Sequence, residues 1–283
     1  MKGLRSFLGS VVRNTKSYFL GVSKFFSNSV KKPSISPIII IGHQKSGTTA
    51  IAQLLGKAIG KSVSIDPFYR TPSKQTQLPS VYSNKKMLGV YIAKNGYLFS
   101  EDIIKDPEFS FFYPELKILY PHSKFVFIIR NPFDNIKSIF DRLKIPGDIK
   151  EFDENFFPEV TKTWDWHTIL NGELTHIKGK NIVETLALRW VYSTHVYLDN
   201  QQHFVLVKYE DFRKNKIESI SNLSINLGEI VRNDISDVMN KQFQPKGKSA
   251  FVEAKDFFSK ENFETIGRIC GDLNRTIYEG ELL

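Results

Sequence analysis

At 283 residues the chain is long for one domain and short for two, which favours a single domain with an insertion. Its one cysteine, Cys270, excludes an internal disulfide and fits a reducing compartment. The formal net charge of +9 is unevenly placed: residues 1–65 hold ten Lys or Arg and no acidic residue, whereas residues 66–283 hold 29 basic and 30 acidic residues. The basic balance therefore belongs to the N-terminal part and does not indicate nucleic-acid binding.

Residues 1–30 predict an amphipathic helix that is separate from the body. Its basic face holds Lys2, Arg5, Arg13, Lys16 and Lys24, and its apolar face holds Leu4, Phe7, Leu8, Val11, Val12, Tyr18, Phe19, Val22, Phe25 and Phe26. Such a helix suits the surface of an anionic membrane. Packing of the apolar face on the body is an alternative, and the composition is also compatible with an organellar transit peptide.

The same segment contains no apolar run near the roughly 20 residues of a membrane span and no continuous apolar region of a secretory signal. We therefore expect a cytoplasmic protein that associates with the inner membrane surface without a transmembrane helix. Residues 31–36 (KKPSIS) predict a linker. The expected division is an N-terminal segment and linker over 1–36 and a catalytic domain over 37–283, with an insertion at about 145–180.

The stretch from Pro37 to Leu55 predicts a buried strand, a tight loop and a helix. Four consecutive isoleucines, 38–41, suit a buried parallel strand that ends at Gly42. The loop 43–47 follows, and Thr48 and Thr49 open a helix with periodic apolar residues. The free N–H groups and the dipole of a helix N-terminus favour an anion at this point.

The spacing of this loop separates it from the phosphate loop of nucleoside triphosphatases. That loop reads GxxxxGK[ST], and here Gly42 and Gly47 have the right spacing but Thr48 stands in place of the lysine. The cation is Lys45, two residues before Gly47. The KSGTT pattern resembles the 5′-phosphosulfate loop of sulfotransferases that use 3′-phosphoadenosine 5′-phosphosulfate (PAPS). The alternative is a plain strand–turn–helix with a surface lysine.

This resemblance to the carbohydrate and tyrosylprotein type of sulfotransferase implies a fold and a set of donor contacts. The fold would be α/β, a three-layer sandwich with a central parallel sheet and a phosphate-binding strand–loop–helix. The donor would be PAPS, with no metal, and no His/Cys/Asp cluster has the spacing of metal ligands. The loop residues that would contact the donor are Gln44, Lys45, Ser46, Gly47, Thr48 and Thr49. Lys45 would also act on the leaving oxygen.

Asp66 is the first carboxylate of the chain and follows a short predicted strand over 62–65. Many sulfotransferases have a glutamate at a similar place, 21 residues after the loop lysine, as general base on the acceptor hydroxyl. The resemblance therefore implies that Asp66 takes the acceptor proton, although aspartate is the shorter carboxylate. Before Pro67, Asp66 is equally interpreted as a turn residue.

Residues 67–100 are polar and predict irregular structure, after which 103–105 predict a strand that ends in a KDP turn. Such a turn is frequent in sulfotransferases of the same types. The resemblance implies that Lys105 points at the sulfuryl group or the acceptor; a surface lysine at a strand end is the alternative. Residues 109–120 then predict a helix with Leu116 and Leu119 directed inward.

A second phosphate motif follows the buried-strand run KFVFII over 124–129. Arg130 ends this strand, and Ser138 lies eight residues later on a helix that Pro132 begins. Arginine offers a bidentate charged contact and serine a hydroxyl, so the two residues can hold one phosphate. The RNPxDxxxS pattern resembles the 3′-phosphate motif of sulfotransferases. Arg130 could also pair with Asp134.

Residues 145–180 interrupt the alternation of predicted strands and helices. We expect this insertion over the mouth of the active site, with Trp164, Asp165, Trp166 and His167 in it. Their aromatic rings are predicted mainly as the small core of the insertion; stacking on a sugar ring is the alternative. A helix over 181–200 and a strand over 203–207 follow.

The last motifs are weaker. YEDF after that strand resembles the late core strand of sulfotransferases, which places Tyr209 near the nucleotide and makes Glu210 and Asp211 caps of a helix over 212–228. Lys246 and Lys248 lie in a basic loop where the family closes over the 3′-phosphate; a solvated loop is the alternative. A helix over about 260–278 ends the fold.

Together these motifs predict in-line transfer of a sulfuryl group from PAPS to a hydroxyl (or amine) of an acceptor, with a carbohydrate or glycolipid preferred. Two other functions compete with this one. A nucleoside-triphosphate-dependent kinase with an altered loop would require magnesium, and a non-catalytic nucleotide-binding protein of the membrane surface would retain the core without the base.

Overall fold

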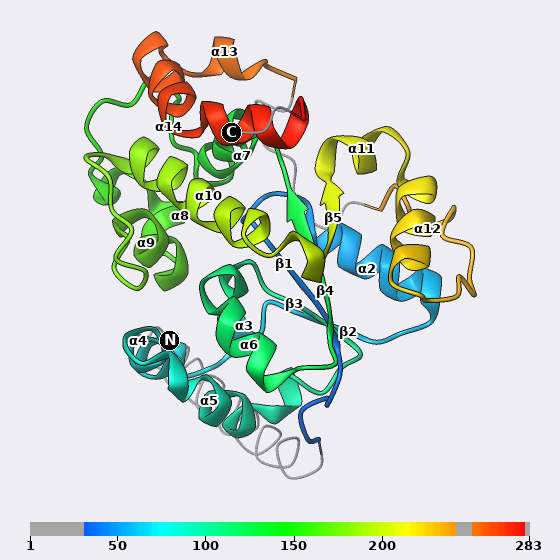
Figure 1. The fold of residues 1–283 in the computed structure, drawn as a ribbon. Coiled ribbons are helices and arrows are strands. Elements are labelled where there is room, and N and C mark those ends of the chain that lie inside the picture. The colour runs from blue at the N-terminus through cyan, green and yellow to red at the C-terminus, as the bar shows by residue number, and fades with distance from the viewer. Residues whose placement is uncertain (1–30, 242–250, 281–283) are drawn as a thin grey trace, which may run out of the picture.

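A computed structural model describes residues 31–241 and 251–280 (Figure 1). The residues 1–30 and the loop lysines 246 and 248 therefore lie outside the described part of the chain. The strands are β1 Ile38–Gly42, β2 Val63–Ile65, β3 Ile103–Lys105, β4 Lys124–Ile129 and β5 Phe204–Lys208. They form one parallel sheet in the order β2-β3-β1-β4-β5.

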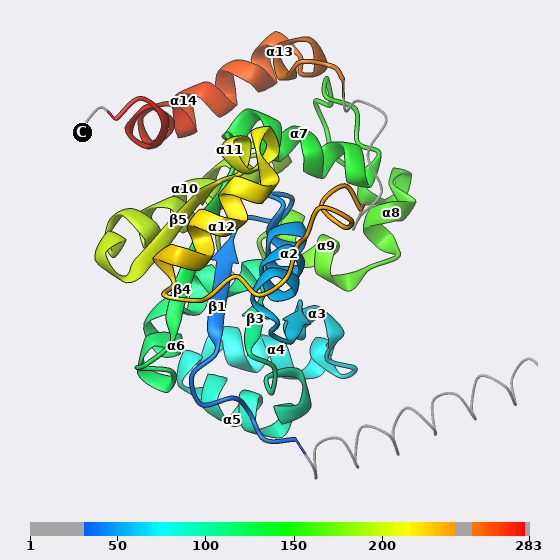
Figure 2. The ribbon, with the colours of Figure 1, turned by 90° about the vertical axis from the view of Figure 1, so that its right-hand side faces the viewer.

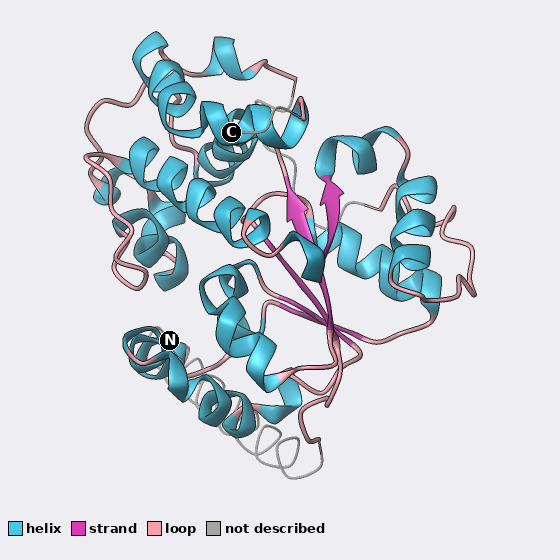
Figure 3. Ribbon diagram, viewed as in Figure 1, coloured by secondary structure: helices cyan, strands magenta, loops and turns pink. Residues whose placement is uncertain are grey.

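The α-helices are α2 Thr48–Ile59, α3 Pro67–Arg70, α4 Lys74–Ser83, α5 Leu88–Lys94, α6 Tyr113–Leu119, α7 Pro132–Leu143, α8 Pro158–Thr161, α9 Trp164–Asn171, α10 Ile182–Leu198, α11 Tyr209–Lys214, α12 Lys216–Asn226, α13 Ala254–Phe257 and α14 Lys260–Tyr278. Short 3₁₀ turns are η1 Lys85–Met87, η2 Gly96–Leu98, η3 Pro107–Phe112, η4 Glu154–Phe156 and η5 Gln201–His203. Figure 3 shows the sheet at the centre and the helices around it.

The strand β1 feeds both layers of the core because successive side chains of a strand point to opposite faces. Ile38 and Ile40 pack with α2 and α12 on one face. Ile39 and Ile41 pack on the other face with a larger core that includes α7, α10 and α14. Figures 1 and 2 show α2 and α12 on the opposite side of the sheet from α10. The predicted α/β fold, with a parallel sheet between helical layers, is confirmed.

Three local predictions were wrong. Residues 67–100 contain α3, α4 and α5 rather than irregular structure, and Leu88 and Tyr91 there are buried in the main core. The predicted helix over 109–120 is split into η3 and α6, and Leu119 is 40% exposed, whereas Leu116 is fully buried. These short helices were not predicted because α4 contains Pro79 in its interior and because the helices are too short to show a clear hydrophobic periodicity.

The third wrong prediction concerns the helix caps after β5. The predicted helix over 212–228 is two helices, and the side chain of Asn215 caps α12 by accepting from the Glu218 N–H. Glu210 instead accepts hydrogen bonds from the Asn131 N–H at 2.9 Å and from the Tyr278 hydroxyl at 2.8 Å. Glu210 thus joins α14 to the start of α7.

Candidate active site

The loop between β1 and α2 is held in a left-handed conformation at two residues. Lys45 has φ 65° and Gly47 has φ 79°. A side chain at residue 47 would lie 2.5 Å from the Tyr209 ring, so glycine is required there. Asn135 of α7 holds the loop in place: its side-chain amide donates to the Gln44 carbonyl at 2.7 Å and to Ser46 Oγ at 3.0 Å.

The carboxyl ends of the parallel strands open into a cavity of about 640 Å³. Most of the predicted site residues line it, as expected for a ligand site at the carboxyl edge of such a sheet. The predicted lining residues that the structure brings together are Gln44, Lys45, Gly47, Thr48, Thr49, Asp66, Lys105, Arg130, Ser138 and Tyr209. Ser46 is the exception, since it is fully buried behind the loop.

Lys45 enters this cavity among other cations. Its pKa is lowered to about 8, first by burial and then by the positive charges of Arg142 and Arg130, while Asp141 acts in the opposite direction. Lys45 is therefore a largely buried ammonium with two arginines near it. Such a group of cations is suited to an anion.

Arg130 is fixed at the end of β4 by three contacts. Its Nη1 donates to the Lys45 carbonyl at 2.9 Å, its guanidinium lies 4.7 Å from the centre of the Tyr209 ring, and its own carbonyl accepts from Trp190 Nε1 at 2.9 Å. Its Nε is buried and has no hydrogen-bond partner within the described chain. A buried donor without a partner is costly, so this nitrogen fits a ligand oxygen.

The carboxylate of Asp66 meets the ammonium of Lys105 on the other side of the loop. Lys105 Nζ lies 2.6 Å from Asp66 Oδ1 and donates to Thr49 Oγ1 at 3.1 Å, and Lys105 is 2% exposed. One ammonium therefore joins the predicted base to the first turn of α2. Asp66 itself takes the left-handed conformation, with φ 49°.

Asp106 ties together the two turns that carry this pair. Its side chain accepts from the Phe68 N–H at 2.9 Å and from the Glu108 N–H at 3.0 Å. Burial and the neighbouring Asp66 raise the pKa of Asp106 well above its usual range. The turns after β2 and β3 are thus fixed to each other through one buried carboxyl group.

Comparison with known proteins identifies the family. The family model described as "Sulfotransferase domain" matches residues 36–264, which is most of the chain. The chain belongs to the sulfotransferase family. Its reaction class is PAPS-dependent sulfuryl transfer, so the kinase and the non-catalytic alternatives are set aside.

Two solved sulfotransferases have a similar fold. Sulfotransferase STF9 from Mycobacterium avium matches with a TM-score of 0.55 and 10% identity, over 88% of this chain and 78% of that one. A sulfotransferase from Alicyclobacillus acidocaldarius matches with a TM-score of 0.50 and 14% identity, over 88% of this chain and 98% of that one. A search of curated proteins gave no significant match.

The cavity also contains a carboxylate network that was not predicted from the sequence. Glu108 accepts from Arg189 Nη2 at 2.7 Å and, through short contacts, from Gln44 Nε2 and the Tyr82 hydroxyl. Arg189 was detectable in the sequence as the one basic Lys or Arg residue of the largely apolar helix over 181–200. Glu108 had no such signal, because its partners lie far away in the sequence.

The start of α9 lines the cavity on one side, through Thr163, Trp164, Asp165 and Trp166. His167 does not, and its ring lies 2.5 Å from Glu154 and 3.1 Å from Glu173. Among residues 31–241 and 251–280, no helix is long and apolar enough to cross a membrane. The same residues contain no cluster of His, Cys, Asp or Glu that could hold a metal ion.

Proposed function

We propose that this sulfotransferase transfers the sulfuryl group of PAPS to a hydroxyl of a carbohydrate or glycolipid. The observation that carries the proposal is that one cavity contains both the cations Lys45 and Arg130 and the carboxylate–ammonium pair of Asp66 and Lys105. The first group suits an anionic donor, and the second suits a hydroxyl that must lose a proton.

The donor half of the mechanism uses the loop and the strand β4. PAPS supplies the sulfuryl group and the leaving phosphate oxygen. We assign the backbone N–H groups of residues 46–49 and the hydroxyls of Thr48 and Thr49 to the 5′-phosphate. Arg130 and Ser138 are assigned to the 3′-phosphate, and Tyr209, which stacks with Arg130, to the nucleotide. Lys246 and Lys248 stay assigned to the 3′-phosphate, outside the described residues.

The reacting groups lie at the first turn of α2. Lys45 stabilises negative charge on the leaving oxygen as the donor S–O bond breaks and the acceptor oxygen bonds to sulfur. The acceptor proton passes to the Asp66 carboxylate. Lys105, which contacts both Asp66 and Thr49, holds the carboxylate beside the first turn of α2. Transfer is in line, so the enzyme mainly positions groups and balances charge.

Calorimetric titration tests the donor. We expect 3′-phosphoadenosine 5′-phosphate (PAP), the desulfated product, to bind without magnesium and ATP with magnesium to bind weakly or not at all. Arg130→Ala should weaken PAP binding by about 100-fold, because it removes a charged bidentate contact worth about 3 kcal/mol. Binding of ATP with magnesium alone would contradict the donor assignment.

We further propose that residues 1–30, outside the described structure, hold the enzyme at an anionic membrane surface where a glycolipid acceptor lies. Their five basic residues and the ten apolar residues of the predicted opposite face support this assignment. The test compares the full chain with a variant whose five basic residues are glutamine, using vesicles with and without anionic lipid. Equal binding of both proteins to anionic vesicles would refute the membrane role.

A further inference from the structure

The central position of β1 divides the active-site cavity into two halves. The loop 43–47 ends β1 and lies between segments that follow β2 and β3 on one side and segments that follow β4 and β5 on the other. The first half also receives α9 and α10, through Asp165 and Arg189. We call these the β2/β3 half and the β4/β5 half.

Among residues 31–241 and 251–280, each cation of the β2/β3 half is paired with a carboxylate. Lys105 pairs with Asp66 at 2.6 Å, and Arg189 pairs with Glu108 at 2.7 Å. A third pair joins Asp165 of α9 to Lys74 of α4. The fourth carboxyl group of this half, Asp106, accepts two backbone N–H groups, and burial raises its pKa. The half therefore offers no excess positive charge.

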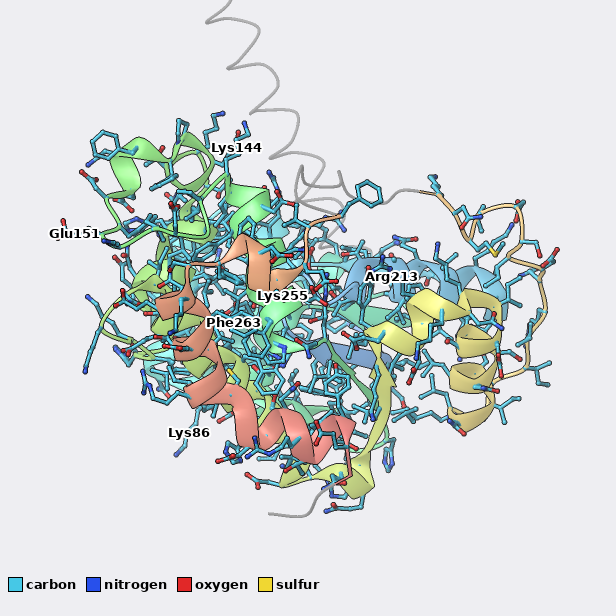
Figure 4. The ribbon with its side chains drawn as sticks, turned by 90° about the horizontal axis from the view of Figure 1, so that it is seen from above. Lys86, Lys144, Glu151, Arg213, Lys255 and Phe263 are labelled. Carbon is cyan, nitrogen blue, oxygen red and sulfur yellow. The ribbon has the colours of Figure 1, made fainter. Side chains whose placement is uncertain are left out.

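The β4/β5 half and the loop are charged differently. Seven cationic and two anionic side chains of the described residues line them, namely Lys45, Arg130, Lys137, Arg142, Arg213, Lys216, Lys241, Asp134 and Asp141 (Arg213 is labelled in Figure 4).

Three of these cations donate to neutral backbone carbonyls. Arg130 donates to the Lys45 carbonyl, Lys137 to the Val252 carbonyl, and Lys216 to the Met239 carbonyl. Arg142 lies 3.7 Å from a carboxylate outside the cavity, Glu159, which also pairs with Lys144 and Lys162. The positive charge of the cavity is thus concentrated on the donor side of the loop.

The walls of the β2/β3 half are largely aromatic and aliphatic. They are formed by Phe68, Tyr69, Leu78, Tyr82, Trp164, Trp166, Ile169 and Leu174. Aromatic rings stack on apolar faces, and such a surface gains free energy by burying hydrocarbon. An anion placed here would lose its hydration and find each nearby cation already paired, so its desolvation would not be compensated.

We propose that the acceptor is an uncharged hydroxyl compound with an apolar portion, and that acceptors with acidic groups, such as anionic polysaccharides and acidic peptides, are rejected by charge. This inference rests on the proposed function and names its acceptor class more narrowly. An uncharged glycolipid meets both requirements, since its sugar offers the hydroxyl and its aglycone the apolar surface.

Three glycosides that differ in one property each provide the test. Octyl glucuronide methyl ester is uncharged, octyl glucuronide carries one carboxylate on the same skeleton, and methyl glucuronide methyl ester lacks the octyl chain. We expect the octyl ester to bind at least about tenfold more tightly than either of the others, since burying two CH₂ groups alone is worth about tenfold. Calorimetry measures all three with and without PAP.

Two variants separate the charge argument from general effects on the fold. Asp165→Asn removes the carboxylate that pairs with Lys74. We expect this variant to reduce the ratio of the affinity for the octyl ester to the affinity for the octyl acid by about tenfold. Glu229→Gln removes a carboxylate of similar burial that pairs with Lys61 and does not line the cavity, so it should leave the preference unchanged. Thermal melting confirms that both variants fold.

The outcomes divide clearly. Equal or tighter binding of the acid by the unaltered enzyme overturns the inference, as does the failure of all three glycosides to bind. An unchanged preference in Asp165→Asn would also overturn it. Failure of PAP to bind would refute the proposed donor alone. The affinities for the ester and the acid are also measured on the free enzyme, so the acceptor inference is tested separately.

Discussion

At the residue scale, Lys45 combines three properties that an ordinary surface lysine lacks. It takes the left-handed conformation, lines the cavity and has a pKa lowered to about 8. The backbone conformation costs about 1 kcal/mol or more for a residue with a side chain. The loop tolerates this cost because Arg130 binds the Lys45 carbonyl and Asn135 binds the Gln44 carbonyl beside it.

Replacing Lys45 tests its assigned role at the leaving oxygen. We expect Lys45→Ala to reduce sulfuryl transfer by at least about 100-fold, because a charge that stabilises the transition state is lost. The fold should persist, as the loop is held through backbone carbonyls. Initial rates with PAPS and circular dichroism measure the two properties. A rate near that of the unaltered enzyme would refute the role.

The lowered pKa of Lys45 predicts a pH dependence of donor binding. The protonated ammonium attracts an anion, so PAP affinity should be full well below pH 8 and fall as the pH rises through about 8, by up to about tenfold per unit. Titrations between pH 7 and pH 9.5 measure the decline. In Lys45→Arg, which keeps its charge, the decline should disappear; its persistence there would assign it to another group.

At the scale of elements, the site depends on the two turns that follow β2 and β3. Each turn carries one member of the Asp66–Lys105 pair, and neither strand contributes more than three residues to the sheet. Their mutual position is reinforced by Asp106, whose two oxygens each accept from a different turn. Asp106 thus acts as a positioning residue for the predicted base.

Substitution of Asp106 should therefore affect chemistry more than donor binding. In Asp106→Asn an amide N–H₂ group would face a backbone N–H, which we expect to lower the free energy of unfolding by about 1–3 kcal/mol. The value of kcat should fall while PAP affinity is kept. The exposed Asp256→Asn serves as the control and should stay within about 0.5 kcal/mol. Equal losses of PAP affinity and kcat would point to general damage.

At the scale of the whole molecule, the sheet order brings together segments far apart in the chain. Because β1 lies between β3 and β4, the first loop of the domain meets the turns after β2 and β3 on one side and α7 and α11 on the other. Both halves of the fold therefore contact a ligand in this cavity. A donor bound there should stabilise the folded domain as a unit.

This stabilisation is measurable as a shift in melting temperature. PAP at about 100 times its dissociation constant should add about 2.7 kcal/mol to the free energy of unfolding. We expect the same shift with magnesium and with a chelator, because the assigned contacts are all protein groups. Arg130→Ala should abolish most of it. A shift that required magnesium would contradict the assigned donor contacts.

The sequence alone determined the features that depend on contiguous residues. The isoleucine run, the glycine spacing of residues 42–47 and the eight-residue step from Arg130 to Ser138 each predict a strand end, a loop or a helix face, because local geometry follows from local spacing. The last helix, Lys260–Tyr278, was predicted on the same basis and confirmed, and so was the α/β fold that the family resemblance implied.

Only the tertiary structure decided which distant side chains meet. Lys105 and Asp66 are 39 residues apart, and Arg189 and Glu108 are 81 residues apart. Periodicity tells which face of an element a residue occupies but not which partner it finds, since that depends on strand order and crossover packing. The separation of paired charges on one side of the loop from excess positive charge on the other follows from this arrangement.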